Sequence, residues 1–152
     1  MTTHLVIPDA DAMEALGARL AGLLAAGDLV VLDGPLGAGK TTLTRGLGAA
    51  LGARGAVTSP TFVLAREHPT VSGVPLVHVD AYRLATAREL DDLDLDYDGA
   101  IVVVEWGAGK LDGVAESWID IVIARDAADD SRDVTITGRG PRWAQLDAVF
   151  AA

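Results

Sequence analysis

The 152-residue sequence contains no cysteine, which excludes disulfide bonds, zinc sites built on thiolates and catalysis by a thiol. It also lacks an uninterrupted apolar run near the ~20 residues that span a membrane, although half of its residues are apolar. The N-terminal residues show neither the basic nor the apolar segment of a secretion signal. Together with a length typical of one domain, these absences predict a single-domain cytoplasmic protein without membrane contact.

Basic residues are scarce. The chain has 12 Lys and Arg against 22 Asp and Glu, for a formal net charge of −10. Proteins that bind duplexes or tRNA directly need clustered basic side chains to neutralise phosphates, and none are clustered here. If nucleic acid enters the function, a partner protein is expected to hold it. The acidic residues concentrate in 91–98 and 126–133, which suit solvated helix ends and loops or, alternatively, a docking face for a basic partner.

The most informative stretch is Gly34-Pro35-Leu36-Gly37-Ala38-Gly39-Lys40-Thr41, which fits the phosphate-loop pattern G-x-x-x-x-G-K-[ST] at every specified position. The apolar run before it, 29–32, predicts a buried strand, and leucines four residues apart after it predict a helix over Lys40–Leu51. Strand, glycine loop and helix N-terminus together bind polyphosphates. Lys40 is expected to contact the β- and γ-phosphates of a nucleoside triphosphate, and Thr41 to ligate Mg²⁺.

Apolar periodicity and turn residues predict the rest of the fold. The expected elements are a strand at 4–7; a helix capped by Asp9 or Asp11 and running to Ala26; strands at 62–68 and Leu76–Asp80 joined by a turn at 69–73; a short helix at 86–93; a strand at 100–105; a flexible loop at 107–113; strands at Trp118–Arg125 and 134–137; and a helix over 141–150. The hairpin implies antiparallel pairing. The predicted fold class is α/β, a single P-loop NTPase-like domain whose mixed parallel and antiparallel sheet is flanked by helices.

Two apolar strands end in an acid, Asp80 in the first and Glu105 in the second. Parallel strands place their carboxyl ends at the ligand-binding edge of a sheet, so both acids are expected to converge there. Either acid fits the Walker B position by pattern alone, and each taken singly also fits a strand-end cap. One division of roles gives Glu105 the Mg²⁺, directly or through water, and gives Asp80 the metal shell or the attacking water.

Four further residues have less specific contexts. Thr61 follows a proline in a stiff loop and suits a switch residue that senses the γ-phosphate, although such threonines are common. Trp106 is a candidate to flank the nucleotide, or a core residue. His78 alternates with valines in a strand and is interpreted as structural. Arg132 is one of several arginines, and its local sequence indicates a surface residue.

Four motifs, in this order and spacing, resemble the bacterial TsaE (YjeE) family. They are Gly34-Pro35-Leu36-Gly37-Ala38-Gly39-Lys40-Thr41-Thr42, Ser59-Pro60-Thr61-Phe62, His78-Val79-Asp80-Ala81-Tyr82-Arg83-Leu84 and Glu105-Trp106. The resemblance covers nearly the whole chain. Pro35 stands where relatives often carry Asp, at a position that the phosphate-loop pattern leaves unspecified.

The resemblance implies an Mg²⁺-dependent ATPase that works with the TsaB and TsaD proteins to form threonylcarbamoyladenosine beside the tRNA anticodon. Hydrolysis would support turnover of the TsaB–TsaD complex without performing the transfer, and tRNA would be reached only through that complex. Hydrolysis by the isolated chain is expected to be slow, because the partners complete the site. Carried over to this sequence, the catalytic residues are Lys40, Asp80 and Glu105, the metal ligands are Thr41 and Glu105, and the nucleotide contacts are Leu36, Gly37, Ala38, Gly39, Lys40, Thr41, Thr42, Thr61, Asp80, Trp106 and Arg132.

Two other functions use the same loop. A small-molecule kinase needs an acceptor pocket and usually an arginine-rich lid, for which the chain offers little room and no basic cluster. A GTPase-like switch commonly carries N-K-x-D, and the sequence at 109–112, Gly-Lys-Leu-Asp, lacks the asparagine.

Overall fold

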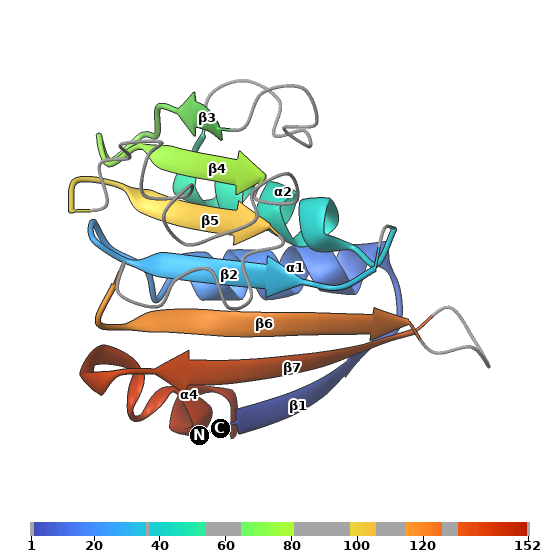
Figure 1. The fold of residues 1–152 in the computed structure, drawn as a ribbon. Helices are drawn as coiled ribbons and strands as arrows, with labels where there is room; N and C mark the ends of the chain where they lie inside the picture. Colours follow the sequence, from blue (N-terminus) through green and yellow to red (C-terminus); the bar gives the residue numbers. More distant parts are fainter. Residues whose placement is uncertain are drawn as a thin grey trace.

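The computed structural model describes residues 2–35, 37–53, 65–80, 98–105, 115–125 and 131–151. In chain order, the elements are β1 (Thr2–Ile7), α1 (Ala10–Ala21), β2 (Leu29–Asp33), α2 (Lys40–Leu51), β3 (Ala65–His68), β4 (Leu76–Asp80), β5 (Ile101–Glu105), β6 (Trp118–Arg125), β7 (Arg132–Arg139), a 3-10 turn (Pro141–Trp143) and α4 (Leu146–Ala151). Figure 1 shows these strands side by side in one sheet, with α1 and α2 behind it.

The described strands form one seven-stranded sheet in the order β1-β7-β6-β2-β5-β4-β3. The central strands β6, β2, β5 and β4 pair in parallel, whereas β1 with β7, β7 with β6, and β3 with β4 pair antiparallel. The predicted hairpin β3–β4 and the mixed sheet are therefore confirmed. β2, the strand before the glycine loop, lies in the middle of the sheet, so the loop that follows it emerges at the centre of the sheet edge.

β2, β4 and β5 are buried on both faces, which explains why they read as continuous apolar runs. The face toward α1 and α2 carries the larger core, which includes Met13, Leu16, Leu20, Val30, Leu32, Leu43, Leu47, Ile101 and Val103. The opposite face carries a smaller cluster, made of Leu29, Val31, Val77, Val79, Ala100, Val102 and Val104.

The helices α1 and α2 touch backbone to backbone. A Cβ atom placed on Gly17 would lie 2.1 Å from the carbonyl oxygen of Leu43, and one on Gly46 would lie 2.1 Å from that of Glu14. Any side chain at either position would push the helices apart. The two glycines therefore hold α2 close to α1, and α1 fixes where the first turn of α2 lies.

The first predicted helix is confirmed at its start and wrong at its end. Asp9 is the N-cap, and its carboxylate accepts the backbone N–H of Ala12 at 2.8 Å. The helix ends at Ala21 and not at Ala26, because the chain tightens into a turn whose Ala25 N–H donates to the carboxylate of Asp28 at 2.7 Å. Asp28 is in turn held by the guanidinium of Arg142, which is distant in sequence.

The predicted C-terminal helix over 141–150 is likewise divided. Pro141–Trp143 forms a 3-10 turn, and α4 begins only at Leu146. Arg142, drawn to Asp28, and the buried Trp143 hold this turn against the sheet. The helix over Lys40–Leu51 and the strands β1, β2, β4, β5, β6 and β7 are confirmed to within two residues at each end. The largest differences are in β1, which begins two residues early, and in β7, which is two residues longer at each end than predicted.

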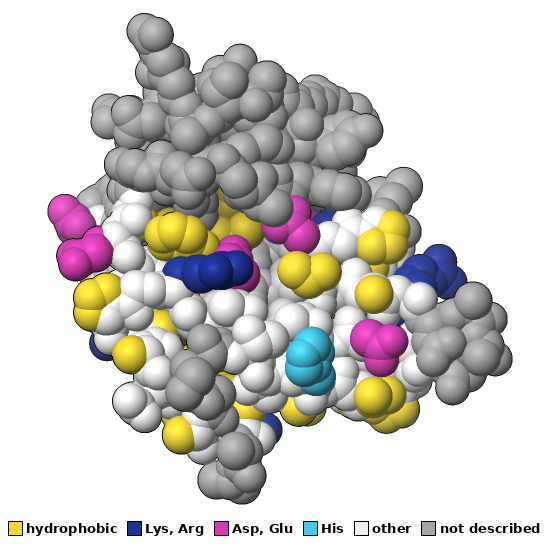
Figure 2. Space-filling model, turned by 60° about the horizontal axis from the view of Figure 1, so that its bottom comes forward, with side chains coloured by type: hydrophobic (Ala, Val, Ile, Leu, Met, Phe, Trp, Pro, Cys, Tyr) yellow, Lys and Arg dark blue, Asp and Glu magenta, His cyan; other side chains and the backbone are white. Residues whose placement is uncertain are grey.

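Several predicted features lie outside the described residues: the beginning of the strand at 62–68, the helix at 86–93, the loop at 107–113 and most of both acidic segments. In the described ranges, no helix is both long and apolar enough to cross a membrane. Figure 2 turns the bottom of the view in Figure 1 toward the reader, and on the described part of this face acidic, basic and apolar side chains are interspersed with uncharged ones.

Candidate functional site

The candidate site lies where three parallel strands end. β2, β5 and β4 are neighbours, so their carboxyl ends meet at one edge of the sheet. In the sheet register, Glu105 lies opposite Asp80 on one side and opposite Leu32 on the other. Glu105 therefore lies between Asp80 and the start of the glycine loop. The structure brings both acids to this edge, while their chemical roles stay predictions.

Lys40, the first residue of α2, is 5% exposed. Its Nζ donates to the carbonyl oxygens of Gly34 at 2.6 Å and Pro35 at 3.0 Å, so the ammonium lies inside the loop. Burial lowers the pKa of Lys40, because the charged form loses water. Three nearby carboxylates oppose that shift: Glu105, Asp33 and Asp80. The loop therefore encloses a cation that faces the acids at the strand ends.

The backbone of the loop requires glycine at two places. Gly39 has φ 116°, and a Cβ atom there would also lie 3.3 Å from Cε of Met13. A Cβ atom on Gly34 would lie 2.4 Å from the carbonyl oxygen of Ile123 in β6. Because the N-cap residue of α2 is Gly39, no side chain caps the first turn of this helix. The N–H groups and the positive end of the helix dipole are thus directed at the loop, as in anion sites.

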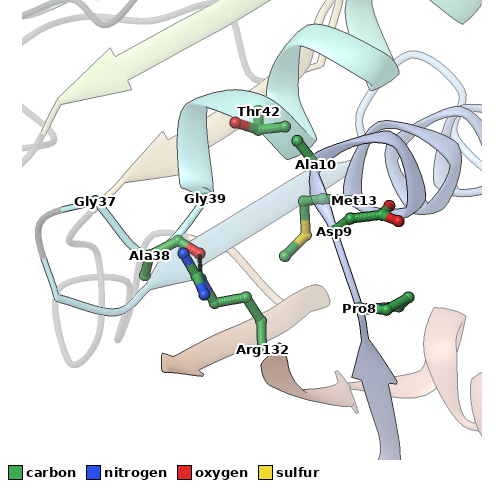
Figure 3. Close-up of a pocket in the computed structure, with 9 residues that line it drawn as sticks. All are labelled: Pro8, Asp9, Ala10, Met13, Gly37, Ala38, Gly39, Thr42 and Arg132. Atoms are coloured by element: carbon green, nitrogen blue, oxygen red, sulfur yellow. Dashed lines mark hydrogen bonds between the residues drawn. The ribbon is translucent and has the colours of Figure 1, made fainter. Parts of the chain in front are cut away.

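A pocket of about 430 Å³ opens beside the loop. Figure 3 shows that its walls come from four parts of the chain: the β1–α1 connection and the first turns of α1, the glycine loop, the first turn of α2 and the start of β7. The lining residues are Pro8, Asp9, Ala10, Met13, Gly37, Ala38, Gly39, Thr42 and Arg132. The pocket therefore adjoins the glycine loop and has mixed apolar and polar walls.

Arg132, whose local sequence indicated a surface residue, lies at this pocket. It begins β7, is half-buried, and its Nε donates to the carbonyl oxygen of Ala38 at 3.0 Å (Figure 3). The two residues are 94 positions apart in the sequence. No pattern in the neighbouring sequence predicts this contact, and only the resemblance to the TsaE family indicated a role for Arg132.

Reasoning from the sequence passed over Asp33, the third acid at the end of an apolar strand and one of the carboxylates that act on Lys40. It also interpreted His78 as structural. His78 is fully buried, as that interpretation requires, but its Nε2 lies 2.5 Å from Oε2 of Glu105. The strand-end pattern was a usable signal for Asp33, whereas the contact of His78 depends on the register between β4 and β5.

Within the described part of the chain, no three acidic or histidine side chains form a group that holds a metal ion unaided. Mg²⁺ is usually bound by one or two protein oxygens together with phosphates and water. The hydroxyl of Thr41, in the first turn of α2, and the carboxylate of Glu105 are oxygen donors of this kind. The donor set fits Mg²⁺ that arrives with a polyphosphate.

The sequence profile described as "Threonylcarbamoyl adenosine biosynthesis protein TsaE" matches residues 7–134. The chain belongs to the TsaE family. A TsaE protein of Streptomyces coelicolor is 59% identical over 147 residues, which cover 92% of this chain and 99% of the relative. The TsaE protein of Haemophilus influenzae is 37% identical over 153 residues, which cover 95% of each chain. The names of both relatives place them in tRNA threonylcarbamoyladenosine biosynthesis.

The fold of this TsaE-family chain is also found in a solved structure. The crystal structure of Bacillus subtilis YdiB superposes with a TM-score of 0.81 at 29% identity, covering 99% of this chain and 95% of YdiB. The α/β fold with its mixed sheet is therefore shared. Three residues that the TsaE resemblance assigns to the site, Leu36, Thr61 and Trp106, lie outside the described residues, and their roles stay predictions.

Proposed function

We propose that this TsaE-family chain is an Mg²⁺-dependent ATPase that supports the TsaB–TsaD complex in forming threonylcarbamoyladenosine next to the tRNA anticodon. The observation that carries the proposal is the buried ammonium of Lys40, held inside a glycine loop and facing Glu105, Asp33 and Asp80. An ammonium held in a glycine loop at the N-terminus of a helix, and bordered by acids, suits a polyphosphate that arrives with a divalent metal.

In the proposed complex, Lys40 exchanges the carbonyl oxygens of Gly34 and Pro35 for oxygens of the β- and γ-phosphates. The first-turn N–H groups of α2 bind the same anion. The pocket beside the loop receives the nucleoside, and Arg132 at its rim contacts the nucleotide. The resemblance adds Leu36, Thr61 and Trp106 to these contacts.

In the proposed reaction, water attacks the γ-phosphorus and the bond to the bridging oxygen of ADP breaks, which yields ADP and phosphate. Thr41 and Glu105 would hold Mg²⁺, which neutralises charge on the phosphates when bound. Asp80, opposite Glu105 in the sheet, belongs to the metal shell or orients the water. Lys40 would stabilise the charge that develops on the β-phosphate of the departing ADP.

The charge of the chain supports a role without direct contact to tRNA. The formal net charge is −10, and basic side chains are dispersed on the face that Figure 2 shows. Binding to tRNA requires basic side chains that displace counterions from many phosphates. TsaB and TsaD are therefore the proposed partners, and tRNA is reached through them.

The decisive experiment measures ATP hydrolysis by the chain alone and with the TsaB–TsaD complex. We expect slow turnover alone and a clear increase with the complex, because the partners complete the site. Parallel reactions with GTP, and with a panel of nucleosides and metabolites as phosphoryl acceptors, separate this function from a GTPase switch and a kinase. Fast hydrolysis that ignores the complex, a preference for GTP, or phosphoryl transfer would contradict the proposal.

Changing Glu105 to Gln is expected to remove Mg²⁺-dependent hydrolysis and to leave part of the nucleotide binding. The amide keeps the size of the side chain and its contact with His78 but supplies no negative charge to a metal. Turnover and ATP binding are measured with Mg²⁺ and with EDTA. The matched control is Glu67→Gln, at an exposed acid of β3, which should behave as the unmodified protein. Wild-type turnover in Glu105→Gln would remove Glu105 from the mechanism.

A further inference from the structure

His78 is a polar residue in a position that favours an apolar one. It lies in β4 between Val77 and Val79, and its surface is 0% exposed. Its Nδ1 atom is buried and has no hydrogen-bond partner in the described part of the chain. A buried polar atom without a partner destabilises the folded state, because it loses its hydrogen bonds to water and gains none in return. An aliphatic side chain would avoid this cost, so the stability of β4 does not explain the histidine.

The hydrogen-bond partners of the ring indicate which nitrogen carries its proton. Nε2 faces Oε2 of Glu105 at 2.5 Å, whereas Nδ1 faces no acceptor among the described residues. A hydrogen on Nδ1 would be buried without an acceptor, and the bare Nε2 would then face a carboxylate. The favoured tautomer therefore carries its hydrogen on Nε2 and donates it to Glu105.

The hydrogen bond from His78 restricts the terminal side-chain torsion of Glu105, which the backbone of β5 does not fix. The terminal torsion of a glutamate side chain has a broad energy well, so a carboxylate rotates easily unless a hydrogen bond fixes it. Glu105 is 4% exposed, so solvent has little access to its carboxylate. With Oε2 bound to His78, Oε1 is the oxygen left for the site.

We propose that His78 is a positioning residue that fixes the carboxylate of Glu105 so that one oxygen stays directed to Mg²⁺ or to a water on it. The inference rests on the proposed function, because it assigns Glu105 to the metal. Ligands held by such outer partners typically lose about 10–100-fold in metal affinity or activity when the partner is removed. A purely structural pair is the alternative, but β4 and β5 are already joined along all five residues of each strand.

Two amide substitutions separate these roles. In His78→Gln the side-chain amide nitrogen occupies about the place of Nε2 and still reaches Glu105. In His78→Asn the amide is one methylene shorter and corresponds to Nδ1, so it leaves Glu105 without a donor. Both variants bury the same functional group, so differences between them report the hydrogen bond and not polarity. Val103→Ala, which removes apolar volume opposite His78 in the register, is the control for lost packing.

The measurements are kcat and KM for ATP with Mg²⁺, ATP affinity with Mg²⁺ and with EDTA from displacement of a fluorescent ATP analogue, and Tm. We expect His78→Asn to lower kcat about tenfold or more and to lose the tightening of ATP binding by Mg²⁺. Affinity in EDTA should be unchanged, and His78→Gln should restore both properties. The metal-dependent part of binding is a readout that does not depend on turnover.

The inference is overturned if His78→Asn and His78→Gln behave alike, or if His78→Asn keeps the kcat and the Mg²⁺ dependence of the unmodified protein. It is also overturned if the fall in kcat in His78→Asn is no larger than its fall in Tm explains, with Val103→Ala as the reference for lost packing. Failure of the proposed function is a different result: the unmodified protein would then show no hydrolysis and no effect of Mg²⁺ on ATP binding.

Discussion

Replacing Lys40 with alanine is expected to abolish ATP hydrolysis and to weaken triphosphate binding by about 1.5–3 kcal/mol, the contribution of a charge-assisted hydrogen bond. That range corresponds to about a 10-fold to 150-fold rise in Kd. In the free protein the ammonium already donates to two loop carbonyls, so binding exchanges neutral partners for anionic ones. Without Lys40, the carboxylates of Glu105, Asp33 and Asp80 also face the incoming phosphates without their nearby cation.

Turnover with Mg²⁺ and displacement of a fluorescent ATP analogue test this expectation. Arg45→Ala is the matched control, because Arg45 is a cation on the same helix with 53% of its side chain exposed. Its ion pair with Glu14, at 3.7 Å, is of the surface type that contributes little. Arg45→Ala should therefore keep both activities, and unchanged turnover in Lys40→Ala would refute the assignment of a phosphate loop.

Replacing Gly46 with alanine is expected to destabilise the protein by about 2–3 kcal/mol through overpacking. The new Cβ would lie 2.1 Å from the carbonyl oxygen of Glu14 and 2.6 Å from its Cα, both backbone atoms of α1. Ordinary contact begins at 3.4 Å, so the helices would have to separate. The better helix propensity of alanine offsets only about 1 kcal/mol. In thermal denaturation, Tm should fall by roughly 5–10 °C.

Gly22→Ala is the control for the glycine substitution. Gly22 follows α1 with φ −66°, and its nearest neighbour to a new Cβ is the carbonyl oxygen of Arg19, at 3.5 Å. Alanine fits there and reduces the freedom of the unfolded chain, so the expected effect is a gain of about 0.5 kcal/mol. A rise in Tm for Gly46→Ala as well would show that α1 and α2 are not in backbone contact.

Within the described residues, the helix after the glycine loop and the buried strands were predicted correctly from local signals. The glycine loop and the helix over Lys40–Leu51 depend on spacings within a few residues, and the buried strands are short apolar runs bounded by turns. The errors arise where a distant residue decides the local conformation. Asp28 contributes to both errors. Its carboxylate accepts the Ala25 N–H in the turn after α1 and binds the guanidinium of Arg142 in the 3-10 turn near the C-terminus. Asp28 and Arg142 are 114 positions apart, so no pattern in a short segment of sequence could predict their contact.

The sequence by itself determined the glycine loop, its lysine and the acids at two strand ends, because each follows from neighbours in the chain. The tertiary structure alone decided that Arg132 reaches the loop and that His78 bonds to Glu105. Both contacts depend on which strands lie side by side and in what register. Strand order and register are set by how the whole chain buries its apolar surface, a condition that no short stretch of residues contains.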